Sequence, residues 1–174
     1  ALLLSGAALV RREDYKRWLC RGHAVVSTFL VFAAFVLWHT MTESTFFYDW
    51  TERFSSIFTN TNYYGYYLTT SVAVCAVLFI HEEKIAWKAV AAVCFIANTV
   101  SLSINDTTGA WVGCAAAMLF IVVTHLILKK FNWQVVMVLV VFAICLYIPG
   151  HILGSFESTM GTLGKDIVSV STGT

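Results

Sequence analysis

Long apolar stretches alternate with short polar segments along most of the chain. Each apolar stretch approaches the roughly 20 residues that an α-helix needs to cross a bilayer. None shows the strict alternation typical of a barrel strand, and the chain contains one proline, so uninterrupted helices are favoured. The stretches that we expect to span a membrane are residues 24–41, 63–80, 85–104, 110–128 and 133–148.

Both ends of the chain bear on its organisation. Residues 1–10 are apolar and are interpreted as the end of a further helix, whereas the last residues are polar and follow Pro149 and Gly150, which are expected to end the last span. The pattern predicts an all-α, polytopic membrane protein with about five full spans and a partial N-terminal one. We expect a single membrane domain over residues 1–174 that is a fragment from the middle of a larger protein.

The composition supports a membrane protein and argues against several kinds of site. Only 12% of the residues are charged, whereas a soluble domain has about 25%. The five cysteines show no Cys-x-x-Cys or Cys/His ligand spacing, so neither a disulfide framework nor a metal site is predicted. No glycine-rich phosphate loop or nucleophile motif is found, and we expect no cofactor.

Lysine and arginine are distributed unequally between the two sets of loops. Of the 11, nine lie on one set, and Arg53 and Lys165 lie on the other. The nine are Arg11, Arg12, Lys16, Arg17, Arg21, Lys84, Lys88, Lys129 and Lys130. Because basic loops stay in the cytoplasm, residues 42–62, the 105–109 turn and the C-terminal tail are predicted to face outward. We interpret the basic N-terminal segment as a topology signal, with lipid-headgroup contact as an alternative, and nothing suggests nucleic acid.

A few polar and small residues lie within or near the spans. For Asn98 and His125 we favour a structural role, such as a hydrogen bond to a neighbouring helix, over a functional one. The small residues Gly109, Gly113 and Ala117 recur every four positions and predict close packing with another helix of the same protein.

Candidate chemistry gathers on the outward side, beginning with Arg53. A guanidinium holds a phosphate or diphosphate through paired N–H donors and stays charged at any working pH. From composition alone, an ion pair between Arg53 and a nearby carboxylate is the favoured alternative. The carboxylates within reach along the chain are Glu43, Asp49 and Glu52.

Asparagines lie at two places on the predicted outward side. Asn60 and Asn62 flank one residue at the start of a span, where asparagine caps a helix and the helix end attracts anions. Capping accounts comfortably for one of the two. Asn105 and Asp106 lie in a short outward loop, within reach of Asn60 if the helices are neighbours; a plain turn is the alternative. Asp106 is a candidate base or polar anchor.

Two stretches of the chain resemble motifs of a known family. Residues 57–68, IFTNTNYYGYYL, resemble the Phe-x-Asn-x-Asn start of a central helix in the O-antigen ligase/polymerase family. Residues 105–113, NDTTGAWVG, resemble its second hallmark, usually a Ser-Arg-Gly-Ala run. The resemblance covers roughly residues 24–174. One departure is Thr108, which stands where many members have arginine.

The resemblance implies an enzyme of the GT-C glycosyltransferase type. Such polytopic enzymes transfer or polymerise glycans carried on undecaprenyl diphosphate at the outer face of the bacterial cytoplasmic membrane, without a metal. The implied partners are a lipid-linked oligosaccharide and membrane lipids. The family's proposed base, a histidine in a large outer loop, would lie outside this chain. The catalytic residue is therefore unknown, and the fragment alone is expected to be inactive.

The resemblance also implies roles for residues in the two stretches. Arg53 would hold the diphosphate, and Asn60, Asn62 and Asn105 would hydrogen-bond sugar hydroxyls or phosphate oxygens, with Asp106 in the same substrate site. A lipid-facing entrance for the polyprenyl chain would be lined by four tyrosines, for which an interfacial aromatic belt is the alternative. These are Tyr63, Tyr64, Tyr66 and Tyr67.

A second function class stays open. The chain could be a non-catalytic component of a transporter or flippase for lipid-linked saccharide, and a purely structural membrane subunit is a further alternative. Transporters place their sites at mid-membrane on broken helices, whereas these spans carry few polar groups in their interiors.

Overall fold

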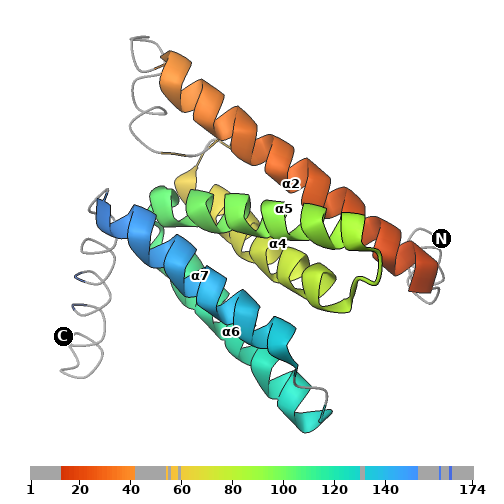
Figure 1. Ribbon diagram of the computed structural model, residues 1–174. Coiled ribbons are helices and arrows are strands. Elements are labelled where there is room, and N and C mark those ends of the chain that lie inside the picture. Colours follow the sequence, from red (N-terminus) through yellow and green to blue (C-terminus); the bar gives the residue numbers. More distant parts are fainter. Residues whose placement is uncertain are drawn as a thin grey trace, which may run out of the picture.

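The computed structural model describes residues 13–41, 54, 56–58, 60–129, 132–152, 161 and 165 (Figure 1). Five helices in this part are long and apolar enough to cross a membrane, which confirms the predicted all-α, polytopic fold. They are α2 (Glu13–Met41), α4 (Thr61–His81), α5 (Ile85–Asn105), α6 (Thr108–Ile127) and α7 (Trp133–Ile152). The N-terminal apolar stretch, residues 1–10, lies outside the described residues.

Successive helices run in opposite directions, so their connections gather at two ends of the bundle (Figure 1). The start of α2, the α4–α5 turn and the α6–α7 turn share what we call the inner end, because the basic loops predict that it faces the cytoplasm. The start of α4 and the α5–α6 turn share the opposite, outer end. The two halves of the candidate site therefore lie at the same end of the bundle.

Helix α4 occupies the centre of the bundle and contacts α2, α5, α6 and α7. Its buried side chains include Tyr64, Leu68 and Val72, and further buried positions continue around the helix. Because apolar side chains gain no hydrophobic free energy by leaving lipid, this packing is stabilised chiefly by van der Waals contact and polar contacts between helices.

Small residues bring α6 close to α4, as the sequence predicted. A Cβ placed on Gly109 would lie 3.2 Å from the Tyr66 hydroxyl oxygen, and one on Gly113 would lie 3.4 Å from Thr69 Cγ2. The Thr69 hydroxyl donates to the Ala110 carbonyl across the same interface (3.0 Å). The small-residue face of α6 therefore serves packing within the chain.

Two helix ends differ from the prediction. Helix α2 begins at Glu13, so most of the basic segment expected to precede the span is helical, and Arg21 is buried against the end of α4. Helix α7 continues through Pro149 to Ile152, so the predicted stop before this proline was wrong. A proline inside a helix removes one backbone hydrogen bond and can kink the helix without ending it.

Candidate functional site

Asn60 caps the start of α4. Its backbone is extended (φ −139°, ψ 131°), and its side-chain oxygen accepts a hydrogen bond from the Asn62 backbone N–H (2.8 Å). This contact satisfies one of the donors that the first turn of a helix leaves without a partner. Capping therefore accounts for Asn60, while the exposed Asn62 side chain lies just inside the helix.

Asn105 joins the α5–α6 turn to the start of α4. Its side-chain amide donates to the carbonyls of Phe54 (2.8 Å) and Thr61 (3.2 Å). The two stretches singled out in the sequence are thus brought into direct contact. The Asn105 side chain is buried, and its oxygen has no hydrogen-bond partner among the described residues.

Gly65 permits this close approach. A Cβ on Gly65 would lie 2.7 Å from the Asn105 side-chain oxygen and 3.0 Å from both Thr107 Cβ and Ala110 Cβ. A distance below 3.0 Å is shorter than real Cβ contacts allow, so a larger residue would require the Asn105 side chain or the turn to shift. Glycine here sets the separation between α4 and the α5–α6 turn.

Asp106 and Asn62 present polar side chains at the surface of the outer end. Asp106 ends α5 in the left-handed conformation (φ 53°, ψ 35°), which aspartate adopts more readily than most residues. Both residues are exposed, whereas Asn105 is buried. Arg53, the predicted phosphate-binding cation, lies outside the described residues. Thr108 is the half-buried first residue of α6.

The four tyrosines of α4 divide between the surface and the interior. Tyr63 and Tyr66 are exposed, at 64% and 53%, in keeping with either a lipid entrance or an interfacial belt. Tyr67 is half-buried beside Phe58 (ring centroids 5.5 Å apart). Tyr64 is fully buried and shares a hydrogen bond with Ser101 of α5 (2.8 Å). Tyr64 thus faces the interior, not lipid as expected, because its ring packs inside the bundle.

A polar layer between α2, α4 and α5 was not predicted from the sequence. The Ser71 hydroxyl donates to the Tyr67 carbonyl (2.9 Å), so the His23 Nε2–H donates to Ser71 Oγ (3.0 Å). The Asn98 amide donates to Ser27 Oγ of α2 (3.0 Å). This last contact agrees with the structural role expected for Asn98. Serines give no clear signal in an apolar sequence because they also bond to their own helix.

His125 bonds within its own helix. Its Nδ1 lies 2.8 Å from the Ile121 carbonyl, so the ring is a donor at this atom. Its buried Nε2 has no hydrogen-bond partner in the described part of the chain, and the ring stacks on His81 (centroids 5.3 Å apart). The expected structural role therefore takes the form of a contact within α6 and a ring contact with α4.

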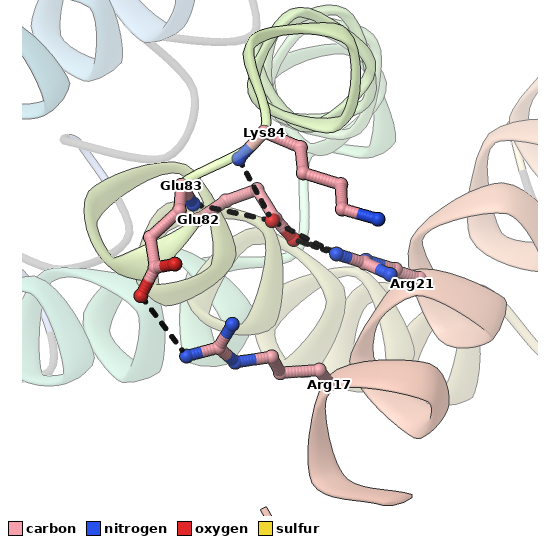
Figure 2. A network of polar contacts seen from close by, with 5 residues as sticks. All are labelled: Arg17, Arg21, Glu82, Glu83 and Lys84. Carbon is pink, nitrogen blue, oxygen red and sulfur yellow. Dashed lines mark hydrogen bonds and ion pairs between the residues drawn. The ribbon is translucent and has the colours of Figure 1, made fainter. Parts of the chain in front are cut away.

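A buried ion pair fastens α2 to the α4–α5 turn at the inner end. The Arg21 guanidinium donates to both carboxylate oxygens of Glu82 at 2.7–2.9 Å, and their side chains are 9% and 1% exposed. Figure 2 shows this pair together with the exposed pair Arg17–Glu83 (3.3 Å). The basic segment, predicted as a topology signal, thus also holds α2 to the end of α4.

The environment of Glu82 favours its ionised form. Burial raises the pKa of the Glu82 carboxyl. The carboxylate accepts hydrogen bonds from Arg21 and from the backbone N–H groups of Lys84 and Glu83, and these bonds lower the pKa, as does the Arg21 charge. Together they outweigh the effect of burial. The net pKa of Glu82 lies below its ordinary value of 4.5.

Comparisons of the chain with known protein families, curated proteins and solved structures found no match. Within the described residues, no group of three or more His, Cys, Asp or Glu side chains is arranged to hold a metal ion. The candidate functional site is the outer end, where the two candidate stretches meet.

Proposed function

We propose that the protein transfers or polymerises a glycan carried on a polyprenyl diphosphate at the outer face of a bacterial cytoplasmic membrane, in the assembly of cell-surface polysaccharide. The observation that carries the proposal is the contact between Asn105 and the start of α4, at 3.2 Å from the Thr61 carbonyl. Because of this contact, the two stretches that resemble the O-antigen ligase/polymerase family form one surface.

The outer end suits a diphosphate leaving group. The first turn of α4 contains no acidic residue, and a helix N-terminus carries partial positive charge that attracts an anion. Asn62 adds an amide donor at this surface, and Arg53 precedes it closely in the chain. During transfer, the bond between the sugar carbon and the diphosphate oxygen breaks while the oxygen of an acceptor hydroxyl forms the new bond. The hydroxyl gives its proton to a base, which the resemblance places outside this chain, and the polyprenyl diphosphate leaves. The charge that develops on the diphosphate is stabilised by a fixed guanidinium.

The exposed tyrosines fit the lipid part of such a substrate. Tyr63 and Tyr66 lie on the exposed surface of the first turns of α4, near the membrane boundary. An aromatic ring with a hydroxyl group combines an apolar body with a polar edge, as a polyprenyl chain ending in a diphosphate requires. These two residues therefore line the proposed polyprenyl entrance.

The test is glycan transfer from a lipid-linked oligosaccharide in membranes that contain the protein at its native length. Arg53→Ala is expected to lower the transfer rate roughly 10- to 100-fold, the effect of losing hydrogen bonds to a charged group. The transfer rate of Arg53→Lys should lie between those of the unchanged protein and Arg53→Ala, because lysine keeps the charge and loses the paired donors. Lys165→Ala removes the other outward cation and should leave the rate unchanged.

Two results would exclude the outer end as the substrate-binding site. Normal transfer by Arg53→Ala at normal expression excludes this arginine from the reaction. Normal transfer by Asn62→Ala as well would show that the start of α4 does not contact the substrate. Protein quantity in the membrane is measured for each variant, so that a loss of rate is separated from a loss of protein.

The polar layer favours a second candidate, a transporter or flippase component for lipid-linked saccharide. Transporters place their sites near mid-membrane, where polar side chains meet between helices. The His23–Ser71 and Ser27–Asn98 contacts lie between helices in this way. Movement of the lipid-linked saccharide across vesicle membranes, without any glycan product, would decide for this candidate.

A further inference from the structure

An apolar groove opens between α4, α5 and α7, away from the outer-end site. Its volume is about 200 Å³. All of its lining side chains are apolar: Phe79, Ala92, Phe95, Ile96, Met137, Val138 and Val141. Ile96 and Met137 are 43% and 40% exposed, so the groove is open at the surface of helices that cross the membrane. An apolar cavity does not hold ordered water, since it offers no hydrogen-bond partners.

A cation lies where the groove approaches the inner end. The Lys88 ammonium is 5.8 Å from the centroid of the Phe79 ring, and Phe79 also lines the groove. The side-chain amide of Gln134 can be oriented so that both its oxygen and its nitrogen have a partner. The oxygen then accepts a hydrogen bond from Lys88 Nζ (2.6 Å), and the nitrogen donates one to the Ile80 carbonyl (2.8 Å). Gln134 thus ties α7 to α4 and directs the ammonium, which has three donors, to this position.

The inner end keeps an excess of positive charge after its ion pairs are formed. Glu82 and Glu83 are neutralised by Arg21 and Arg17. In the described part of the chain, no carboxylate pairs with Lys84, Lys88 or Lys129. Figure 2 shows Lys84 beside the Glu82 network without an ion pair to it. These cations match the negative surface of a cytoplasmic leaflet.

We propose that an anionic phospholipid of the inner leaflet binds here, with its phosphate at the Lys88 ammonium and one acyl chain in the groove. The spacing along α5 supports this occupant. Ala92 and Ile96 lie four and eight residues deeper than Lys88, which is about 6–12 Å at 1.5 Å per residue. That order places the apolar lining directly below the charged group, as the two parts of a phospholipid require.

Lipid retention by the purified protein tests this site. The protein is transferred to detergent containing equal amounts of phosphatidylglycerol and phosphatidylcholine with identical acyl chains, and bound lipid is counted by native mass spectrometry. We expect phosphatidylglycerol to exceed phosphatidylcholine about fivefold, the factor that one basic residue contributes near an anionic membrane surface. Lys88→Gln should bring this ratio near one, while Lys129→Gln, which changes a cation away from the groove, should preserve it.

The groove is tested separately by filling it. Ala92→Phe should lower the retention of both lipids, whereas Ala116→Phe, on the exposed surface of α6, should not. If Ala92→Phe loses helical content by circular dichroism, Met137→Trp on the open side of the groove replaces it. Equal retention by the two phenylalanine variants overturns the proposal, because lipid would then bind elsewhere.

Two further results would also overturn it. Equal retention of both lipids by the unchanged protein would exclude recognition of an anionic headgroup. Retention of no lipid would mean that another part of the chain, or a second copy, covers the groove. Neither result bears on glycan transfer, which is assigned to the opposite end, so the two proposals fail independently.

Discussion

At the residue scale, the asparagines show how far a sequence motif can be taken. The sequence indicated that capping would account for one of Asn60 and Asn62, and Asn60 is the cap. It also indicated that Asn105 and the start of α4 would meet if the helices were neighbours. It gave no sign that Asn105 is buried, because burial depends on how closely α4 approaches, and Gly65 sets that distance.

Gly65→Ala should destabilise the protein. The added Cβ would meet the Asn105 side-chain oxygen at 2.7 Å. Such overpacking costs typically about 1–3 kcal/mol, against a gain of up to about 1 kcal/mol in helix propensity. We expect a net loss of about 1 kcal/mol in the free energy of unfolding, measured by titrating a denaturing detergent into mixed micelles.

Gly22→Ala is the matched control for this substitution. Gly22 is also helical, but a Cβ there would meet no atom within 4 Å. Helix propensity then acts alone, and the free energy of unfolding should rise by up to about 1 kcal/mol. An equal rise for Gly65→Ala would show that the α5–α6 turn does not press against α4 as described.

At the element scale, hydropathy located all five described helices, and their ends were harder to predict. The middle three helices match their predicted spans to within two residues at each end. The start of α2 was missed because a basic segment in isolation resembles a loop, and only the contact with Glu82 shows why it is helical. The end of α7 was missed because a proline can kink a helix without ending it, and Pro149 lies inside α7.

The ion pair between α2 and the α4–α5 turn should make stability depend on pH. The folded pKa of Glu82 lies below its ordinary value of 4.5, so its stabilising contribution is complete above that value. The contribution is lost as the pH falls from about 4.5 through the lower folded pKa. The free energy of unfolding should therefore decrease over this acidic window, and Glu82→Gln should remove that part of the pH dependence.

Two variants distinguish the energetic effect of the Arg21–Glu82 charges from that of burying their side chains. Glu82→Gln leaves the Arg21 charge buried and uncompensated, and at neutral pH it should lower the free energy of unfolding by about 3–5 kcal/mol. Replacing both residues by methionine should cost much less, because no buried charge then remains. A double variant as unstable as Glu82→Gln would argue against a dominant role for charge.

At the scale of the whole molecule, the distribution of charge predicts orientation, and the fold divides the charges between two ends. Because each apolar stretch is expected to cross the membrane once, successive connections alternate between the two sides, so the sequence also predicted which loops share an end. It did not predict the polar layer or the apolar groove. Both depend on which faces of α2, α5 and α7 meet, and periodicity within nearly uniform apolar helices does not specify this.

Orientation can be measured with single cysteines and a membrane-impermeant maleimide in intact cells. In a background lacking the half-buried Cys20 and Cys145, Ile57→Cys at the outer end should react from outside. Lys129→Cys, at the inner end, should react only after the membrane is permeabilised. The opposite pattern would place the proposed glycan site in the cytoplasm and overturn the enzyme proposal.

The contacts of α2 have a consequence for biogenesis. Arg21, His23 and Ser27 each bond to a residue that comes at least 48 positions later in the chain, the nearest in sequence being Ser71, the partner of His23. During synthesis α2 therefore reaches the membrane before α4 and α5 have been made. Until those helices are present, the polar side chains of α2 lack these partners. We therefore expect stable insertion of α2 to depend on the synthesis of α4 and α5.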